Sequence, residues 1–325
     1  MSSPLLKVEG LAVEFGPKAA PVRVVEDVSF AIDAGGCLGI VGESGSGKSV
    51  TSLSILRLLP EPAGRIAAGR ILFQGLDLLS LPRARMPDIR GRDIAMIFQE
   101  PMSSLNPLMT IGDQIGEVMY LHEDIGAAER SAKTAEILRK VGILNPAERM
   151  KAYPHQFSGG MRQRAMIAMA LACNPKLLIA DEPTTALDVT IQAQVLDLMK
   201  RLRKTLNTAI MFISHDLGVI ADIADRVIVM YAGRVVEDAD VRSIFKRPAH
   251  PYTRGLLQSI PDLKANARRL QQIPGSIPAA GTIKQGCAFY ARCAQRIARC
   301  EREAPPMMTL GAGHAAACWV ASGPT

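Results

Sequence analysis

Short apolar runs and helical periodicity alternate along most of the chain. The first 41 residues contain three strand-like stretches, at 11–15, 22–32 and 37–41, separated by turns rich in glycine and proline. Later strands are predicted at 70–73, 94–98, 177–180, 209–213 and 227–230. Helices are predicted at 48–59, from Gly160 to Cys173, at 190–206 and from Asp216, with a helical region over 101–157. Strands that alternate with helices are typical of an α/β fold in which helices cover a parallel sheet.

The pattern weakens after residue 260. The last part of the chain has few strand or helix signals, and four of the six cysteines fall within the last 39 residues. We therefore expect two regions: an α/β domain over 1–260, with its helical part at about 101–157, and a small cysteine-rich extension over 261–325.

Composition narrows the class of protein. The 325 residues are 48% hydrophobic and 21% charged, which is ordinary for a globular chain. A net charge of +7 suits phosphate ligands or an anionic membrane surface but is too small to indicate nucleic acid by itself. No stretch reaches the roughly 18 apolar residues of a spanning helix, and the amino end lacks a secretory signal. We expect a soluble cytosolic chain, in which disulfides are disfavoured.

A glycine-rich motif joins a predicted strand to a predicted helix. Gly42-x4-Gly47-Lys48-Ser49 fits the phosphate-loop pattern. Its glycines allow the backbone to wrap around phosphates, and N–H groups at the helix start point towards the anion. Lys48 is expected to neutralise the β- and γ-phosphates, and the Ser49 hydroxyl to ligate Mg²⁺. The residues assigned to the nucleotide here are Gly42, Ser44, Gly45, Ser46, Gly47, Lys48, Ser49 and Val50.

A second motif places two carboxylates after an apolar strand. The run 177–180 leads directly into Asp181 and Glu182. Asp181 is expected at the carboxyl edge of the sheet, near the magnesium ion. Glu182 is then placed to orient or deprotonate the attacking water.

A third motif, Ser158-Gly159-Gly160, precedes a helix and forms a candidate second anion-binding nest. Together with Gln99, Asp188 and His215 and the two motifs above, it forms an ordered set. This set resembles the ATP-binding subunits of ABC transporters over nearly all of residues 5–240. The resemblance implies a nucleotide domain with a RecA-like parallel core, an antiparallel β subdomain and a helical subdomain.

The same resemblance implies a composite ATP site. ATP on Lys48 of one subunit is capped by Ser158, Gly159 and Gly160 of another, so hydrolysis requires a dimer. Gln99 senses magnesium and water and links to the membrane subunits, while His215 contacts the γ-phosphate. Asp188 lies at the dimer interface, and Phe15 matches the aromatic residue that stacks on adenine, with a core role in its strand as the alternative.

The signature departs from the family pattern at two positions. It begins with Phe157 rather than leucine, and Met161 stands where glutamine is usual. Neither position faces phosphate in the family, so we expect a working signature.

The later sequence resembles one importer family more narrowly. Residues 249–253 and 273–275, Gly286 to Phe289, and Arg292-Cys293 are similar to segments of the dipeptide, oligopeptide and nickel importers. The resemblance implies a substrate-binding protein, two membrane-spanning permease subunits and a second, non-identical ATPase at the cytoplasmic face of the bacterial plasma membrane. Peptide is the favoured cargo, and nickel, an opine or a glycoside stays open.

The four late cysteines have the spacing Cys287-x5-Cys293-x6-Cys300-x17-Cys318, without the close C-x2-C pairs usual in zinc modules. Positive charge on nearby arginines favours ionised cysteine side chains. A proline-rich segment with little hydrophobic core is also suited to stabilisation by a bound metal. We predict an iron–sulfur site, 4Fe–4S, as the resemblance also suggests for some relatives; zinc, free thiols or disulfides remain alternatives. His314 is expected in a loop, with a role as a ligand of this site as the alternative. Cys37 and Cys173 are expected to be inert thiols inside apolar elements.

Two other classes of function compete with transport. ABC-type ATPases that act on nucleic acid or ribosomes carry long coiled-coil insertions or two fused nucleotide domains, and this sequence has neither. We therefore expect no nucleic-acid partner. A redox-sensing regulator built on the late cysteines is the other alternative.

Overall fold

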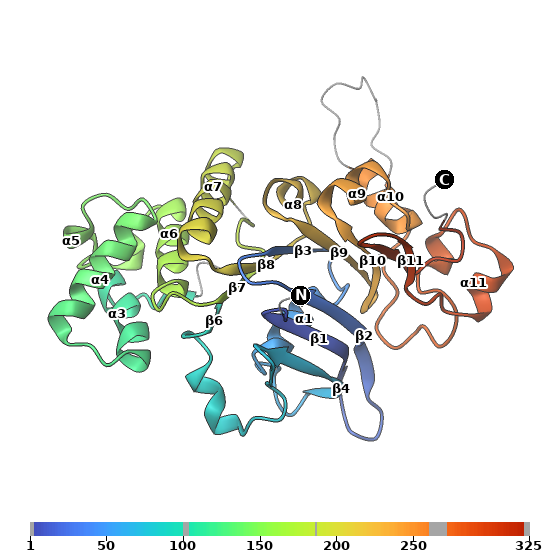
Figure 1. Ribbon diagram of the computed structural model, residues 1–325, viewed down its shortest axis with the longest axis horizontal. Coiled ribbons are helices and arrows are strands. Elements are labelled where there is room, and N and C mark those ends of the chain that lie inside the picture. The colour runs from blue at the N-terminus through green and yellow to red at the C-terminus, as the bar shows by residue number, and fades with distance from the viewer. Residues whose placement is uncertain (1–2, 100–103, 186, 260–271, 322–325) are drawn as a thin grey trace. The chain divides into compact units, whose positions relative to one another are not determined.

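The computed structural model describes residues 3–99, 104–185, 187–259 and 272–321 (Figure 1). The chain divides into two compact units. Unit 1 contains residues 1–5, 32–36 and 80–213, and unit 2 contains 6–31, 37–79 and 214–325. The predicted boundary between residues 260 and 261 and the predicted helical start at Pro101 lie outside the described residues.

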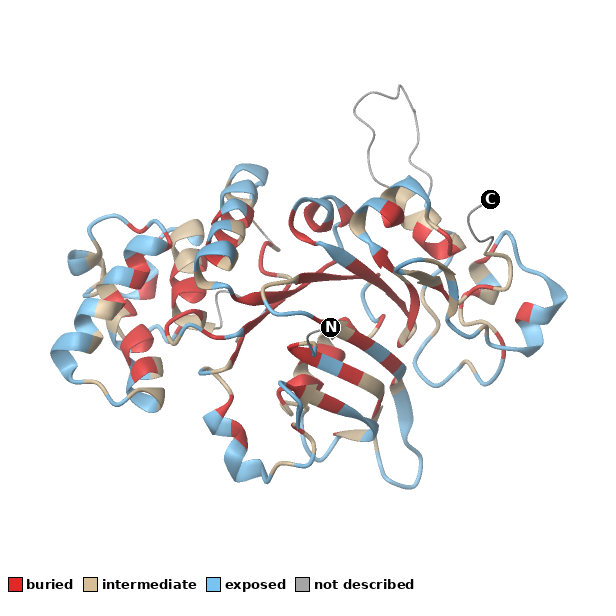
Figure 2. Ribbon diagram, viewed as in Figure 1, coloured by how far each residue is buried: buried red, intermediate tan, exposed pale blue. Residues whose placement is uncertain are grey.

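Unit 1 contains a parallel sheet in the strand order β8-β7-β6. Ile94 lies beside Leu177, and Leu177 lies beside Ala209, so the three strands run in register. Every residue of β7 and β8 is buried, as Figure 2 shows in red. Continuous apolar strands of this kind occur where both faces of a parallel sheet are covered. The strands are β6 (Ile94–Ile97), β7 (Leu177–Asp181) and β8 (Ala209–Ser214).

Three α-helices of unit 1, α3, α6 and α7, begin at a side-chain cap. The side chains of Thr110, Ser158 and Asp188 each accept a hydrogen bond from a backbone N–H of the following first turn. The helices are α3 (Ile111–His122), α4 (Ala127–Lys140), α5 (Pro146–Arg149), α6 (Gly159–Ala170) and α7 (Val189–Leu206). Short 3-10 turns occur at Arg83–Asp88 and Pro154–Gln156.

Unit 2 contains a four-stranded sheet in the order β2-β1-β4-β5. β1 and β4 are antiparallel, and so are β4 and β5. This is the predicted antiparallel subdomain, and it carries Phe15 at the end of β1. The strands are β1 (Leu6–Phe15), β2 (Val22–Ile32), β4 (Gly64–Phe73) and β5 (Leu76–Asp77).

A second set of strands in unit 2 has the order β11-β12-β10-β9-β3. β3 and β9 are parallel, and the remaining neighbours are antiparallel. The strands are β3 (Cys37–Val41), β9 (Arg226–Tyr231), β10 (Arg234–Asp240), β11 (Met308–Gly311) and β12 (His314–Ala316). The helices are α1 (Lys48–Ile55), α8 (Leu217–Ile223), α9 (Val241–Lys246), α10 (Pro251–Gln258) and α11 (Ala298–Arg302), with a 3-10 turn at Tyr290–Arg292.

The late sequence is more regular than predicted. β12 pairs with β10, so a strand beyond residue 300 extends the sheet that carries β9 and β3. The prediction missed β10 and also β11, β12 and α11, which have only three to five residues each. His314, predicted in a loop, begins β12.

The first helix ends earlier than its sequence predicts. α1 stops at Ile55, although no proline occurs before Pro60. Arg57 adopts a left-handed conformation with φ 53°, and the N–H of Leu58 donates to the carbonyl of Leu53 at 2.8 Å. This hydrogen-bond pattern is a Schellman cap, which normally uses glycine and is therefore hard to recognise at an arginine.

Among the described residues, no helix combines the length and the apolar character needed to cross a bilayer.

Candidate functional site

The phosphate loop of unit 2 joins the buried strand β3 to helix α1. A Cβ atom at Gly42 would collide with the carbonyl oxygen of Met230, so the close approach of β9 requires glycine here. Gly47 caps α1 with φ 100°, a conformation that side-chain-bearing residues rarely adopt. The backbone of the loop therefore requires glycine at these two positions.

Lys48 folds back over the loop. Its Nζ atom donates to the carbonyl oxygens of Gly42 at 2.7 Å and Glu43 at 3.0 Å and lies 3.5 Å from the Ser46 hydroxyl. The residue is only 5% exposed. The ammonium group is thus held at the centre of the loop, where phosphate oxygens can replace the carbonyl partners.

The remaining predicted loop residues differ in exposure. Ser46 is buried, Ser49 and Val50 are half-buried, and Ser44 and Gly45 are exposed. These exposures leave the outer turn of the loop open to a ligand.

Two other predicted residues of unit 2 lie at strand ends. Phe15 ends β1 half-buried, paired with Gly64, where a Cβ atom would come within 3.0 Å of the phenyl ring. His215 is exposed directly after β8, and Asp216 beside it caps α8. Neither placement excludes the predicted role of Phe15 at adenine or of His215 at phosphate.

Gln99 and Glu182 are brought together in unit 1 although 83 residues separate them. The Gln99 Nε2 atom donates to the Glu182 carboxylate at 3.2 Å, and the Thr185 hydroxyl donates to the same oxygen at 3.0 Å. Glu182 has φ 49°, an unusual conformation for a residue with a side chain. Asp181, immediately before it, is buried at the end of β7. The carboxylate of Glu182 is therefore held in a defined position by two neutral donors.

Two of these positioning contacts were missed from the sequence. Thr185 lies only three residues after Glu182, a spacing that indicates the contact once the left-handed turn is known. Gln163 is fully buried in α6, and its Nε2 atom donates to the carbonyl of Pro183. That bond ties the signature helix to the turn that carries Glu182.

The signature residues start helix α6. Ser158 accepts from the N–H of Met161 at 3.3 Å, so it serves as the N-cap. Ser158 and Gly159 are exposed, and a Cβ atom at Gly159 would meet no neighbour within 4 Å. Phe157, which departs from the family pattern, is buried. The departure therefore lies in the core, while Ser158 and Gly159 beside it are accessible.

Asp188 has a structural role that the sequence did not indicate. Its carboxylate caps α7 by accepting from the N–H of Ile191 at 2.9 Å, and the residue is exposed. The side chain of the same Ile191 would lie 3.1 Å from a Cβ atom at Gly160. The start of α7 thus packs directly against the start of α6.

Three of the four late cysteines lie in surroundings that disfavour the thiolate. Burial raises the pKa of the Cys287 thiol to about 11, and burial also raises the pKa values of Cys293 and Cys318. The neighbouring thiols add to each rise, because a second negative charge nearby disfavours ionisation. In the described residues, no group of three or more histidine, cysteine, aspartate or glutamate side chains is arranged to hold a metal ion.

The nearby arginines also have partners of their own. Arg292 pairs with Glu43, Arg296 lies over the Tyr290 ring, and Arg299 lies over the Trp319 ring. The charge of Arg296 still lowers the pKa of Cys293, but burial has the larger effect and raises it.

The two other cysteines are unreactive in different surroundings. Cys37 is buried in β3, as predicted. Cys173 lies in the turn after α6 rather than inside the helix, and burial raises its pKa to about 11. The Cys173 thiol is therefore protonated near neutral pH.

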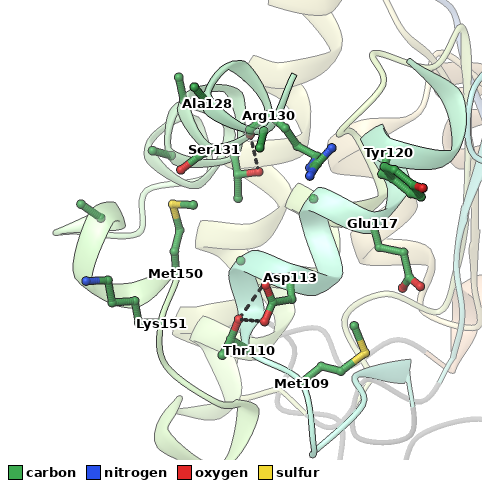
Figure 3. Close-up of a pocket in the computed structure, with 17 residues that line it drawn as sticks. Met109, Thr110, Asp113, Glu117, Tyr120, Ala128, Arg130, Ser131, Met150 and Lys151 are labelled. Carbon is green, nitrogen blue, oxygen red and sulfur yellow. Dashed lines mark hydrogen bonds between the residues drawn. The ribbon is translucent and has the colours of Figure 1, made fainter. Parts of the chain in front are cut away.

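Unit 1 also contains a hollow of about 990 Å³ lined by α3, α4, α5 and the adjoining turns. Figure 3 shows Glu117 and Tyr120 on α3, with Arg130 reaching in from α4. The Arg130 guanidinium lies 5.3 Å from the centre of the Tyr120 ring. None of the residues predicted to bind nucleotide or metal lines this hollow.

Comparison with protein families identifies two regions. Residues 25–185 match the model described as ABC transporter, and residues 236–300 match the model described as oligopeptide/dipeptide transporter, C-terminal region. The second match begins within β10 and includes Cys287, Cys293 and Cys300.

Several relatives align with this chain over most of their length. The chain is 52% identical over 316 residues to a probable peptide ABC transporter ATP-binding protein of Sinorhizobium fredii, covering 97% of this chain and 94% of the relative. It is 50% identical to the oligopeptide transport ATP-binding protein OppD of Bacillus subtilis, covering 97% and 88% of the two chains. The Bacillus subtilis dipeptide transport protein DppD is 48% identical, with 97% and 94% covered.

A solved structure supports the fold. The ATP-binding cassette MJ0796, determined as a dimer bound to ADP and phosphate, matches with a TM-score of 0.65 and 26% identity. The match covers 73% of this chain and 99% of that one.

Proposed function

Because the chain belongs to the family of ATP-binding subunits of ABC transporters, we propose that it hydrolyses ATP to energise the import of di- or oligopeptides. The observation that carries the peptide cargo is the match of residues 236–300 to the C-terminal region of oligopeptide and dipeptide transporters. Relatives named for peptide transport are about half identical along nearly the whole chain. Nickel, opines and glycosides are the alternative cargoes of the same machinery.

In this proposal, each candidate residue has its own role in binding or hydrolysing ATP. Lys48 exchanges its loop carbonyl partners for the β- and γ-phosphates, and Phe15 stacks on adenine. Glu182 orients or deprotonates the attacking water, while its contacts with Gln99 and Thr185 fix the carboxylate. His215 contacts the γ-phosphate.

Magnesium fits the donor atoms that these residues supply. Ser49, Gln99 and Asp181 offer a hydroxyl, an amide and a carboxylate oxygen, the hard ligands that Mg²⁺ prefers. When bound, magnesium neutralises charge on the phosphates.

The proposed transporter also contains a second ATP-binding subunit. The exposed Ser158 and Gly159 at the open end of α6 offer backbone N–H groups to a nucleotide held by another subunit. Asp188, exposed at the start of α7, lies at the interface in the same arrangement. We infer a non-identical partner, as in the importers that this chain resembles.

The permease partners are expected to dock on the helical part of unit 1. Leu108, Tyr120 and Leu121 are 85%, 68% and 67% exposed, unusually high values for large apolar side chains. Tyr120 and Leu121 lie on α3 and Leu108 in the turn before it, and exposed apolar residues in one region favour a protein contact. Such docking places the chain peripherally at the cytoplasmic face of the membrane, with the binding protein engaged only indirectly.

Peptide-stimulated ATP hydrolysis tests this function. The complex is reconstituted in liposomes with both permeases, the second ATPase and the binding protein, and dipeptides or pentapeptides are added. We expect hydrolysis to rise severalfold, because cargo delivery favours the state in which the ATPases close. Stimulation by nickel or a glycoside alone would contradict the peptide cargo. Copurification of RNA in place of permeases would contradict transport.

We further infer that Cys287, Cys293, Cys300 and Cys318 hold an iron–sulfur cluster of the 4Fe–4S type. Four sulfur donors suit such a cluster, and the four thiols lie close enough for their charges to interact. Since the described residues form no ready metal group, binding must draw these side chains closer together. The cluster's role is to cross-link and so stabilise a segment that has little hydrophobic core of its own.

Metal analysis tests the cluster. After anaerobic purification, we expect iron and acid-labile sulfide in equal amounts, and both should be lost when Cys300 is replaced by serine. The Cys37→Ser variant is the matched control and should keep its iron. Zinc without sulfide would contradict the cluster, and ATP hydrolysis that responds to oxidation of the cluster would favour a redox-sensing role over a stabilising one.

A further inference from the structure

Glu43, the second residue of the phosphate loop, is held at three points. Its carbonyl oxygen accepts from Lys48, its N–H donates to the Tyr252 hydroxyl at 2.9 Å, and its carboxylate accepts from the Arg292 guanidinium at 3.0 Å. Tyr252 lies on α10, and Arg292 lies in the late region of the chain. Two residues more than 200 positions away therefore hold one residue of the loop, and all these groups belong to unit 2.

The side chain of Arg292 is held in place by hydrogen bonds and ring contacts. Its side chain is only 6% exposed, and its guanidinium donates to the carbonyls of residues 273–275 at 3.4, 2.9 and 3.3 Å. The same group lies 5.7 Å from the centre of the Tyr231 ring and 6.0 Å from that of Phe289. A planar guanidinium with donors in fixed directions satisfies all these partners, and a lysine ammonium cannot.

Tyr252 is equally constrained. It is fully buried, with its ring centre 4.7 Å from that of Tyr231 and 5.4 Å from that of Phe289. Burial raises the pKa of its hydroxyl, which therefore stays neutral. The three rings join the end of β9, helix α10 and the cysteine-rich region, and the Tyr252 hydroxyl reaches the loop from this cluster.

The negative charge of Glu43 affects how strongly the phosphate loop can bind a polyanionic ligand. Its side chain is 30% exposed, so its negative charge is partly desolvated beside a loop shaped for phosphates. Arg292 neutralises that charge. Without Arg292, the unpaired carboxylate would repel the phosphates, and the loop would lose one of its three attachments.

We propose that Arg292 and Tyr252 are positioning residues through which the late region of the chain sets the affinity of the phosphate loop for ATP. The proposal rests on the proposed function, since it assumes that ATP binds this loop. Both residues act through their contacts with Glu43, so neither needs to contact the nucleotide. We therefore expect a change in ATP affinity with little change in the rate of the chemical step.

The test measures magnesium–ATP affinity of the full chain together with the KM and kcat of the assembled complex. For Arg292→Ala we expect Kd and KM to rise about tenfold, the size of one lost charge-assisted hydrogen bond, with kcat changed less than twofold. Arg296→Ala is the matched control, because its guanidinium lies over the Tyr290 ring in the same segment. It should bind ATP like the wild type.

Two further variants separate charge from folding. Adding Glu43→Gln to Arg292→Ala removes the unpaired carboxylate and should restore most of the lost affinity. Tyr252→Phe keeps the ring packing and removes only the hydroxyl, so Kd should rise about threefold. Arg292→Lys should give an intermediate affinity, because it keeps the charge and loses the fork.

Three results would overturn the proposal: unchanged affinity in Arg292→Ala, an equal loss in Arg296→Ala, or no recovery in the Glu43→Gln double variant. Failure of the wild type and of Arg296→Ala to bind ATP would instead contradict the proposed function. The two failures are therefore distinguishable in one set of titrations.

Discussion

Replacing Glu182 by glutamine is expected to lower ATP hydrolysis by the assembled complex about a hundredfold or more, while ATP binding stays intact. The carboxylate lies on a left-handed turn directly after β7, where Gln99 and Thr185 donate to it. A glutamine side chain has nearly the same shape but cannot accept a proton from water. The measurement is the hydrolysis rate of the reconstituted complex beside a direct titration with magnesium–ATP.

The control for Glu182→Gln is the same change at an exposed site. Glu136 pairs with Lys140 on α4 at 2.7 Å, and an exposed pair of this kind contributes little to stability. Glu136→Gln should leave hydrolysis unchanged. Undiminished hydrolysis in Glu182→Gln would mean that the partner's site performs the reaction, and the role assigned to Glu182 would be wrong.

Replacing Lys48 by alanine is expected to weaken ATP binding about a hundredfold or more. The ammonium group is placed at the centre of the loop, and two lost charge-assisted hydrogen bonds to phosphate correspond to at least about 3 kcal/mol. The carbonyls of Gly42 and Glu43 also lose their donor, so some loss of stability should accompany the loss of binding. Calorimetric titration measures the affinity, and thermal unfolding measures the stability.

The matched control for this change is Lys140→Ala, which removes an exposed lysine from α4. ATP affinity in this control should equal that of the wild type. If Lys48→Ala bound ATP with unchanged affinity, the nucleotide would be bound elsewhere and the phosphate-loop assignment would be contradicted.

The parallel core could be predicted because its physical signal is strong. Strands such as β7 and β8 are buried along their whole length, so they occur as continuous apolar runs between helices. The late strands could not be predicted in this way. β12 has three residues and is positioned by its pairing with β10, a contact between distant parts of the chain.

The candidate site likewise contains residues that local sequence patterns predict and contacts that they do not. The phosphate loop, Asp181, Glu182 and the signature are local patterns, and residue type with spacing indicates their chemistry. The contacts of Gln163 with Pro183 and of Arg292 with Glu43 join residues 20 and 249 positions apart. No local pattern encodes them. The balance of effects on Cys293 depends on the fold in the same way, because burial there outweighs the charge of Arg296.

Peptide accumulation by the reconstituted complex tests the central claim most directly. Vesicles that carry the complete transporter are supplied with ATP on the side of this chain and with a labelled dipeptide on the side of the binding protein. The account predicts ATP-dependent uptake that falls to background in Glu182→Gln. ATP hydrolysis without peptide uptake, under conditions in which nickel or a glycoside is accumulated, would contradict it.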